Sequence, residues 1–385
     1  MGLSLAVALG VGACGDGGGG GLTVVREDRP DLPLAGLTEA ERARFDVGDA
    51  LFDREFRPSQ GLGPVYIRAA CSRCHVDDGR GPGAVERAIR VSGDGFTPLD
   101  DQGPFRAGPV LRPQFVAPAT RGVTAPWSVP AEGVLRSARI GPAVFGRGWF
   151  EAVPDAVIEA GARAQAEGGV LRGRVNRDAT GRVGRFGLKA RVATLEDFAA
   201  DAFRNDMGLT SRWQPTEVPN DDGLDDDARP GLDLDDDTVR ETAFYVAALA
   251  IPRRTGLSAE GAMRFAEAGC AGCHTPSLAT GPAAPFAGMA NTVAPLYSDL
   301  LVHDMGVGLA DGTREGLAGP RDWRTAPLMG LRFFRTFLHD GRARSVEEAI
   351  VMHRQEGSEA NASVAAFEAL SAEARAQLLG FVSRL

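Results

Sequence analysis

The sequence predicts a mainly α-helical protein of two similar domains with long loop-rich insertions. Three observations lead to this fold class. The stretches at 69–78 and 268–277 share one pattern of cysteine and histidine, and each lies downstream of a helix-like segment. Amphipathic segments with capping residues recur along the chain, whereas no convincing series of alternating strand-like segments is present. The chain has 385 residues, which is more than one domain usually holds.

The N-terminal segment has the features of a bacterial lipoprotein signal. The apolar stretch LSLAVALGVGAC ends at Cys14, which we interpret as the lipidated first residue of an exported chain. The rest of residues 1–22 is rich in glycine and would be a flexible tether. We expect a periplasmic lipoprotein held to a membrane by its lipid anchor alone, because no later stretch approaches the about twenty apolar residues of a membrane span. A chance cysteine in a disordered N-terminus is the alternative, because the segment lacks positive charge.

The first predicted domain covers residues 36–251. Its first helix starts at Thr38, which forms a capping box with Glu41 in TEAERARFDVGDALF. A second amphipathic segment, TLEDFAADAF, is capped by Thr194. The acidic stretch at 221–237 lacks the spacing of an EF-hand loop, so we expect solvated acid there rather than a calcium site. A further helix, TVRETAFYVAALA, ends at the domain boundary.

The second predicted domain covers residues 252–385. Its helices are expected to start at Ser258, at Ser345 and near Ser371, each of which can cap a helix with its hydroxyl group. The last of these helices carries an apolar face, which suits packing against the rest of the domain.

A weak internal repeat links the two domains. Gly48 precedes Phe52 by one helical turn, and Gly261 precedes Phe265 in the same way. Each pair lies in the helix that leads toward a cysteine motif, so the repeat predicts two units of the same design.

The two cysteine motifs carry the chemistry. Each has the form Cys-x-x-Cys-His, which is typical of covalent attachment of a c-type haem. Zinc knuckles or dithiol redox centres are the alternatives, but these motifs lie too far apart in the chain to share one metal ion. We expect two covalently bound c-type haems in two cytochrome-c-like haem domains. The attachment residues are Cys71, Cys74, Cys270 and Cys273, with His75 and His274 as proximal iron ligands.

The remaining histidines and methionines form the pool of sixth iron ligands. The spare histidines are His303, His339 and His353, and all lie in the second domain. No histidine occurs between 75 and 274, so an open iron in the first domain is consistent with this count. From the residues alone, any of the three could serve the second iron.

Charge and basic residues carry less information. The net charge of −9 argues against nucleic acid as a partner. Every basic residue except Lys189 is an arginine, which we interpret as coding bias, so that single arginines receive little functional weight.

From about residue 40 to 356 the sequence resembles the bacterial di-haem oxidoreductase family, whose members are often described as peroxidases or thiol oxidoreductases. The stretches that carry the resemblance are GLGPVYIRAACSRCHVDDGRG, GRFGLKARVATLEDFAADAFRNDMGLTS, LLVHDMGVGLADG and WRTAPLMGLRFFRTFLHDGRARSVEEAIVMH. The family looks related to the di-haem cytochrome c peroxidases and to the di-haem enzyme that matures methylamine dehydrogenase. The thiol label gains no support here, because every cysteine is assigned to haem or lipid.

The resemblance implies roles for single residues of the second domain. In the relatives a His-Asp-Gly triplet is followed at a fixed distance by the sixth ligand of the C-terminal haem. His339 begins that triplet here, and His353 stands at the ligand position. This implies a haem bound by His274 and His353, with His339 near the site but not a ligand. His303 matches a histidine whose role is not defined.

The resemblance also implies an acid–base residue in the first domain. Asp206 takes the place of the catalytic glutamate of the peroxidases, whereas Met207 would ligate the first iron in the alternative reading. Leu188 stands where the relatives have a tryptophan between the haems. Leucine cannot carry an electron hole, so this departure argues against long-range oxidation of a partner protein.

The expected function is therefore a peroxidase-like di-haem oxidoreductase. Its N-terminal haem would bind a peroxide-type oxidant, and its C-terminal haem would transfer electrons from a small redox donor protein or a quinol-linked chain. The alternative is a di-haem electron carrier in which both irons have six ligands. The resemblance further implies a calcium ion between the haem domains, held largely by backbone carbonyl groups.

Overall fold

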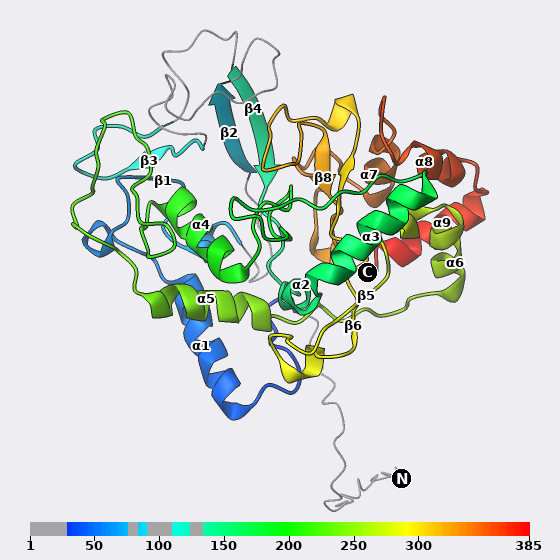
Figure 1. Cartoon of the computed structure of the whole chain (residues 1–385), viewed down its shortest axis with the longest axis horizontal. Helices are drawn as coiled ribbons and strands as arrows, with labels where there is room; N and C mark the ends of the chain where they lie inside the picture. Colours follow the sequence, from blue (N-terminus) through cyan, green and yellow to red (C-terminus); the bar gives the residue numbers. More distant parts are fainter. Residues whose placement is uncertain (1–28, 76–83, 91–109, 124–133) are drawn as a thin grey trace, which may run out of the picture.

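The computed structural model describes residues 29–75, 84–90, 110–123 and 134–385 of the chain (Figure 1). In this part it contains nine α-helices, several short 3₁₀ turns and four two-stranded sheets. The predicted lipoprotein signal with Cys14 and the tether lie outside the described residues.

The helices fall into an N-terminal and a C-terminal group (Figure 1). The first group is α1 (Glu39–Asp53), α2 (Gly148–Ala152), α3 (Asp155–Gly168), α4 (Leu195–Met207) and α5 (Asp236–Ala248). The second group is α6 (Ala259–Glu267), α7 (Val346–Met352), α8 (Asn361–Glu368) and α9 (Ala372–Val382).

The predicted helix starts are confirmed. The hydroxyl groups of Thr38, Thr194, Ser258, Ser345 and Ser371 each accept a hydrogen bond from a backbone N–H three residues later. These bonds satisfy donors that the first helical turn leaves without a partner. At Thr38 the backbone N–H also donates to the carboxylate of Glu41, at 2.8 Å, which completes the capping box.

The expectation of a mainly α-helical chain is only partly confirmed, because the architecture is mixed. The strands pair in antiparallel fashion: β1 (Val65–Tyr66) with β3 (Gln114–Phe115), β2 (Ala84–Arg90) with β4 (Val134–Ile140), β5 (Leu278–Ala279) with β6 (Val293–Ala294), and β7 (Val302–Asp304) with β8 (Asp322–Arg324). Most of these strands have two or three residues, too few for a period-two pattern to be recognised. Strands β2 and β4 are longer, but a long connection separates them, so neither carries a hairpin signal.

The weak glycine repeat is explained by two helix crossings (Figure 1). Helix α1 packs across α5, and helix α6 packs across α9. A Cβ atom on Gly48 would lie 2.4 Å from the carbonyl oxygen of Glu241, and one on Gly261 would lie 2.6 Å from that of Gln377. Both glycines therefore allow two backbones to approach more closely than any side chain permits.

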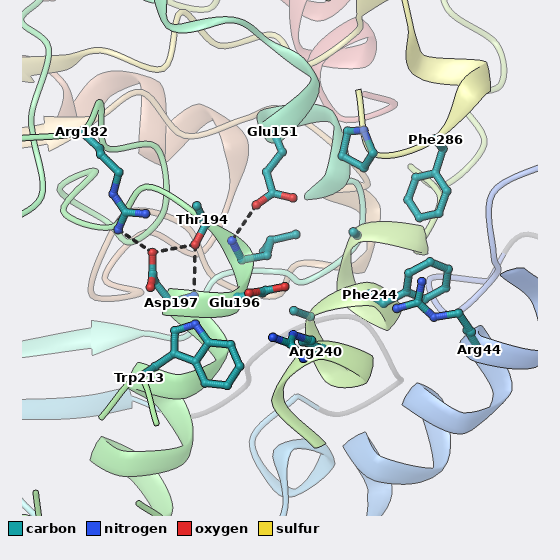
Figure 2. A pocket seen from close by; sticks show the side chains of 14 residues that line it. Arg44, Glu151, Arg182, Thr194, Glu196, Asp197, Trp213, Arg240, Phe244 and Phe286 are labelled. Carbon is teal, nitrogen blue, oxygen red and sulfur yellow. Dashed lines mark hydrogen bonds and ion pairs between the residues drawn. The ribbon is translucent and has the colours of Figure 1, made fainter. Parts of the chain in front are cut away.

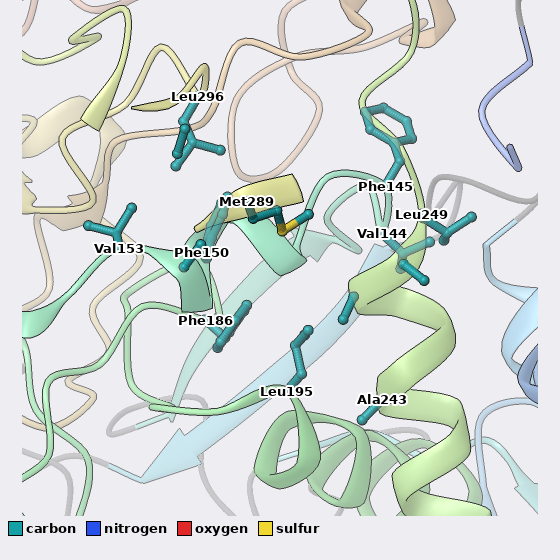
Figure 3. Packing of buried hydrophobic residues seen from close by; sticks show 14 of the residues in the cluster. Val144, Phe145, Phe150, Val153, Phe186, Leu195, Ala243, Leu249, Met289 and Leu296 are labelled. Carbon is teal, nitrogen blue, oxygen red and sulfur yellow. The ribbon is translucent and has the colours of Figure 1, made fainter. Parts of the chain in front are cut away.

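The largest hydrophobic cluster lies on both sides of the predicted domain boundary (Figure 3). Phe150, Phe186 and Leu195 come from the first predicted domain, and Met289 and Leu296 come from the second. The rings of Phe150 and Phe186 stack at 5.6 Å between centroids. Apolar burial thus continues across the boundary, and the division into two domains stays a prediction.

Among the described residues, no helix combines the length and the apolar character that spanning a membrane requires.

Candidate functional site

The first Cys-x-x-Cys-His motif forms a single 3₁₀ turn, Cys71–Arg73. The backbone N–H groups of Cys74 and His75 both donate to the carbonyl oxygen of Cys71, at 3.0 and 2.9 Å. This turn brings two partly buried thiols and one imidazole together. Burial raises the pKa of the Cys71 thiol to about 12, and the nearby carboxyl group of Asp206 raises it further. The thiols are free rather than joined in a disulfide.

The imidazole of His75 is held in an apolar setting. Its ring centroid lies 5.8 Å from that of Phe52, one turn beyond the crossing glycine of α1. Burial lowers the pKa of His75 to about 4, and the positive charge of Arg147 lowers it further. The Nδ1 atom is buried and has no hydrogen-bond partner within the described part of the chain. A neutral imidazole with a nitrogen to spare is what ligation of haem iron requires.

The second motif repeats this arrangement on the turn Cys270–Gly272. The Nδ1–H group of His274 donates to the carbonyl oxygen of Tyr297 at 3.1 Å, which leaves Nε2 as the lone-pair nitrogen. Burial lowers the pKa of His274 to about 4, and His353 is the next cause of that lowering. Cys270 and Tyr297 pack on one apolar cluster with Ile350 of α7.

His353 caps the C-terminal end of α7, and its effect on the pKa of His274 places it near the second motif. Its Nδ1–H group donates to the carbonyl oxygen of Ala349 at 2.5 Å, which again leaves Nε2 available. Burial lowers the pKa of His353. Two neutral imidazoles, each oriented by a backbone carbonyl group, therefore lie near the second motif.

His303 is engaged at both ring nitrogens. Nε2 donates to Asp299 and Nδ1 donates to Glu359, each at 2.9 Å, and the Sγ atom of Cys273 lies 3.7 Å from Nδ1. Although burial lowers its pKa, these hydrogen bonds raise the pKa of His303 to about 12. A doubly donating imidazolium has no lone pair for iron, so this geometry argues against His303 as a ligand.

His339 lies in a different cluster. Its ring stacks on Trp323 at 3.7 Å between centroids and 13° between planes. Burial lowers the pKa of His339 to about 4. Lys189 and Arg139 lie over the same tryptophan, at 4.3 and 5.3 Å from its centroid. Two cations beside Trp323 disfavour a radical cation on its ring.

Asp206 and Met207 end helix α4 next to the first motif. Burial raises the pKa of Asp206 to about 7, and Asp201 adds to this, whereas Arg112 and Arg191 oppose it. Asp206 in turn raises the pKa of both Cys71 and Cys74, after burial. Its carboxylate has no hydrogen-bond partner among the described residues. It is thus free to exchange a proton beside the thiols.

Met207 is 3% exposed and belongs to an apolar cluster with Phe56 and Phe203. Cys71 packs against that cluster. The structure therefore brings both the acid–base candidate and the alternative iron ligand to the first motif.

Three basic side chains that no sequence motif singled out are buried in this region. Lys189 forms an ion pair with Asp311 at 2.9 Å and donates to three backbone carbonyl groups, so it is a structural cation. Arg147 and Arg324 are 7% and 6% exposed. Burial lowers the pKa of both guanidinium groups. Arg324 also donates its backbone N–H to the carbonyl oxygen of Leu188 at 2.9 Å.

These observations fit two c-type haems. Each motif offers two free thiols and one neutral imidazole on a single turn, and the second motif adds a further neutral imidazole. The buried Nδ1 of His75 has no hydrogen-bond partner among the described residues, so the surroundings of this polar group are incomplete there.

Three carboxylates cluster at the acidic stretch that was predicted as a solvated loop. One oxygen atom from each of Glu217, Asp226 and Asp227 lies within 4.8 Å of the others. Burial, followed by repulsion from Asp233, Asp227 and Asp226, raises the pKa of Glu217 to about 8. Glu217 precedes the stretch that the sequence analysis singled out.

An open pocket of about 410 Å³ lies between α1, α4 and α5 and the loop around Phe286 (Figure 2). Trp213, Phe244 and Phe286 give it aromatic walls, while Arg182 is paired with Asp197 at 2.7 Å. None of the predicted haem or acid–base residues lines this pocket.

Comparisons with known proteins agree with the motifs. The model of the family described as "Di-haem oxidoreductase, putative peroxidase" matches residues 126–385. No curated protein matches the chain. Among solved structures, hydrazine synthase of Kuenenia stuttgartiensis, pressurised with xenon, aligns over 100% of this chain and 99% of its own, with 13% identity and a TM-score of 0.42. A likeness this low carries no argument about function.

Proposed function

The chain belongs to the di-haem oxidoreductase family, and from this premise we propose that it is an exported c-type enzyme that reduces a peroxide-type oxidant. The oxidant would react at the N-terminal haem, and the C-terminal haem would receive electrons from a small redox donor protein or a quinol-linked chain. When bound, the two haems supply iron that exchanges electrons with the oxidant and the donor.

Each motif would supply the residues that attach one haem and ligate its iron. Cys71 and Cys74 would hold the first haem by thioether bonds, with His75 as its proximal ligand. Cys270 and Cys273 would hold the second haem, and His274 and His353 would ligate its iron. The available Nε2 atoms of His274 and His353 support this assignment. No histidine occurs between 75 and 274, so the first predicted domain offers no second histidine to its iron. This supports an open first iron.

Asp206 would move the proton that peroxide reduction needs. Breaking the O–O bond requires a proton to leave the inner oxygen and reach the outer one, and a positioned carboxyl group can accept and return it. A pKa of about 7, raised chiefly by burial, places Asp206 near the pH where both proton states are populated. The single observation that carries the proposal is this carboxyl group, whose pKa is raised chiefly by burial and which in turn raises the pKa of Cys71 and Cys74.

A di-haem electron carrier is the second candidate. Met207 favours it, because this buried side chain belongs to the cluster on which Cys71 packs. A methionine sulfur on the first iron would leave no open position for an oxidant.

Location and further ligands complete the proposal. The lipoprotein signal at Cys14 supports a periplasmic protein tethered by lipid, since c-type haem is attached outside the cytoplasm. A calcium ion between the haem domains would be held by backbone carbonyl groups. Both follow from the sequence and from the relatives.

Absorption and low-temperature EPR spectra of the haem-loaded protein test the proposal. They should be recorded in the oxidised and half-reduced states, before and after addition of hydrogen peroxide. We expect one high-spin haem whose signal is lost when peroxide is added. Two low-spin haems that ignore peroxide in both redox states would support the electron carrier instead.

A further inference from the structure

We propose that Arg147 and Arg324 form a buried binding site for haem carboxylates, and that Arg147 holds a propionate of the haem attached at Cys71 and Cys74. The inference rests on the proposed function insofar as it assumes that haem is attached at this motif. It concerns two arginines that neither the sequence nor the family match assigns to any role.

Both guanidinium groups are buried, and neither has an ion-pair partner in the described part of the chain. Arg147 donates from Nε to the carbonyl oxygen of Ala143 at 2.6 Å, and Arg324 donates to the carbonyl oxygens of Gly187 and Thr325 at 3.0 Å each. Neither meets a carboxylate at ion-pair distance within the described part of the chain. Each therefore keeps N–H groups that the protein's own atoms do not use.

Two other buried cations, Arg139 and Lys189, have carboxylate partners. Arg139 pairs with Asp311 and Glu315 at 2.5 Å each, and Lys189 pairs with Asp311 at 2.9 Å. These two cations therefore have carboxylate partners, whereas Arg147 and Arg324 have none among the described residues.

The two uncompensated cations also lie close to each other. Their guanidinium carbons lie 4.9 and 5.2 Å from the ring centroid of Phe150. Burial lowers the pKa of Arg147, and the charge of Arg324 lowers it further. Two neighbouring buried charges of the same sign destabilise the fold unless an anion compensates them. The site is therefore complete only when it contains an anion.

The position of Arg147 and Arg324 indicates which kind of anion they bind. Phe150, beside which both guanidinium carbons lie, belongs to the apolar cluster on which Cys71 of the first motif packs. After burial, the charge of Arg147 also lowers the pKa of His75. The pair hence lies near the first haem motif. Because both arginines are more than nine-tenths buried, the anion has to belong to a group enclosed by the fold rather than to the solvent.

Haem provides that group. It carries two carboxylates on the edge away from the vinyl groups that cysteines bind. A guanidinium group offers a planar fork of donors that matches a carboxylate, which a single ammonium group cannot do. Arg147, on the His75 side, would bind a propionate of the first haem and partly neutralise it. A positive charge near the iron favours the ferrous state and raises the midpoint potential.

The test uses the haem-loaded full chain with R147Q, R147K, R324Q and the control R163Q, which changes an exposed arginine on α3. Spectroelectrochemical titration of each haem from pH 5 to 9 and resonance Raman spectra of the propionate bending bands are the readouts. We expect R147Q to lower the midpoint potential of the N-terminal haem, to make that potential depend more on pH, and to shift a propionate band. R147K should retain more of the potential but still shift the band, and R163Q should match the wild type.

Several outcomes would overturn the inference. Unchanged propionate bands and potentials in R147Q would do so, and a shift confined to the C-terminal haem would refute the assignment of Arg147. If R147Q fails to incorporate haem, R147K tests the inference instead. A wild-type propionate band in R147K would show that the guanidinium fork of Arg147 does not bind the propionate. A wild-type chain that incorporates no haem would contradict the proposed function itself, which distinguishes the two failures.

Discussion

Asp206 shows how position gives a common side chain a specific chemistry. Its pKa is raised to about 7 by burial, with Asp201 adding to this and two arginines opposing it. The pKa of an exposed aspartate is about 4, so its carboxyl group would be ionised near neutrality and could not return a proton there. The carboxyl group also lies beside the first pair of thiols, as its effect on their pKa values indicates.

Asp206→Asn should keep both haems but slow peroxide reduction by roughly 10²-fold, because the amide cannot accept the proton of the inner oxygen. In the wild type the rate should rise with pH through about 7, since the raised pKa keeps Asp206 protonated below that value. The variant should lose this pH dependence. Stopped-flow absorption after mixing with peroxide measures both effects.

The matched control is Asp46→Asn, which changes an exposed carboxyl group on α1 and should leave the rate unchanged. A wild-type rate in the Asp206 variant would remove Asp206 from the mechanism and turn attention to Met207 as an iron ligand.

At the scale of single elements, the two helix crossings repeat one packing solution. Gly48 on α1 and Gly261 on α6 each lie against the backbone of a partner helix, and Phe52 and Phe265 follow one turn later. Phe52 packs on Tyr245 at 5.3 Å between ring centroids, and Phe265 packs on Phe381 at 5.7 Å. The crossings hold the helix that leads into each haem motif.

Gly48→Ala and Gly261→Ala should each destabilise the protein by about 1–3 kcal/mol, because a Cβ atom at either site would overlap the partner helix. The measurement is chemical denaturation of the haem-loaded protein followed by far-UV circular dichroism. Haem incorporation at the affected motif should fall as well.

Gly161→Ala on α3 is the control, because a Cβ atom there would meet nothing within 4 Å. Alanine is the better helix former, so this variant should gain about 0.5–1 kcal/mol. Equal effects at all three glycines would contradict the crossing explanation.

At the scale of the whole molecule, the two haem motifs are linked by buried structure rather than by a flexible connection. The largest apolar cluster of the described residues has members on both sides of the predicted boundary, and Phe150, beside which Arg147 and Arg324 lie, belongs to it. Such a continuous interior would keep the two motifs at a constant separation.

Cys14→Ala should release the exported protein from the membrane, because lipid attachment at that thiol is the proposed anchor. Cell fractionation with haem staining measures this: the wild type should pellet with membranes, and the variant should stay in the soluble periplasmic fraction. Both proteins should carry haem. A wild-type chain that is already soluble would contradict the lipoprotein assignment.

The amino-acid sequence by itself determined the features that neighbouring residues specify. The haem motifs, the hydroxyl caps at Thr38 and Ser345 and the paired glycines all depend on chemistry within a few positions of the chain. Helices that start with such caps were therefore predicted with their correct beginnings.

Only the tertiary structure decided which distant side chains meet. It placed His353 in the buried region of His274, enclosed His303 between two carboxylates and paired the short strands. It also buried Arg147 and Arg324 with no ion-pair partner among the described residues, although the sequence offered no way to distinguish them from the other arginines. The physical reason is that burial and charge compensation depend on packing between residues far apart in the chain, and no local pattern records that packing.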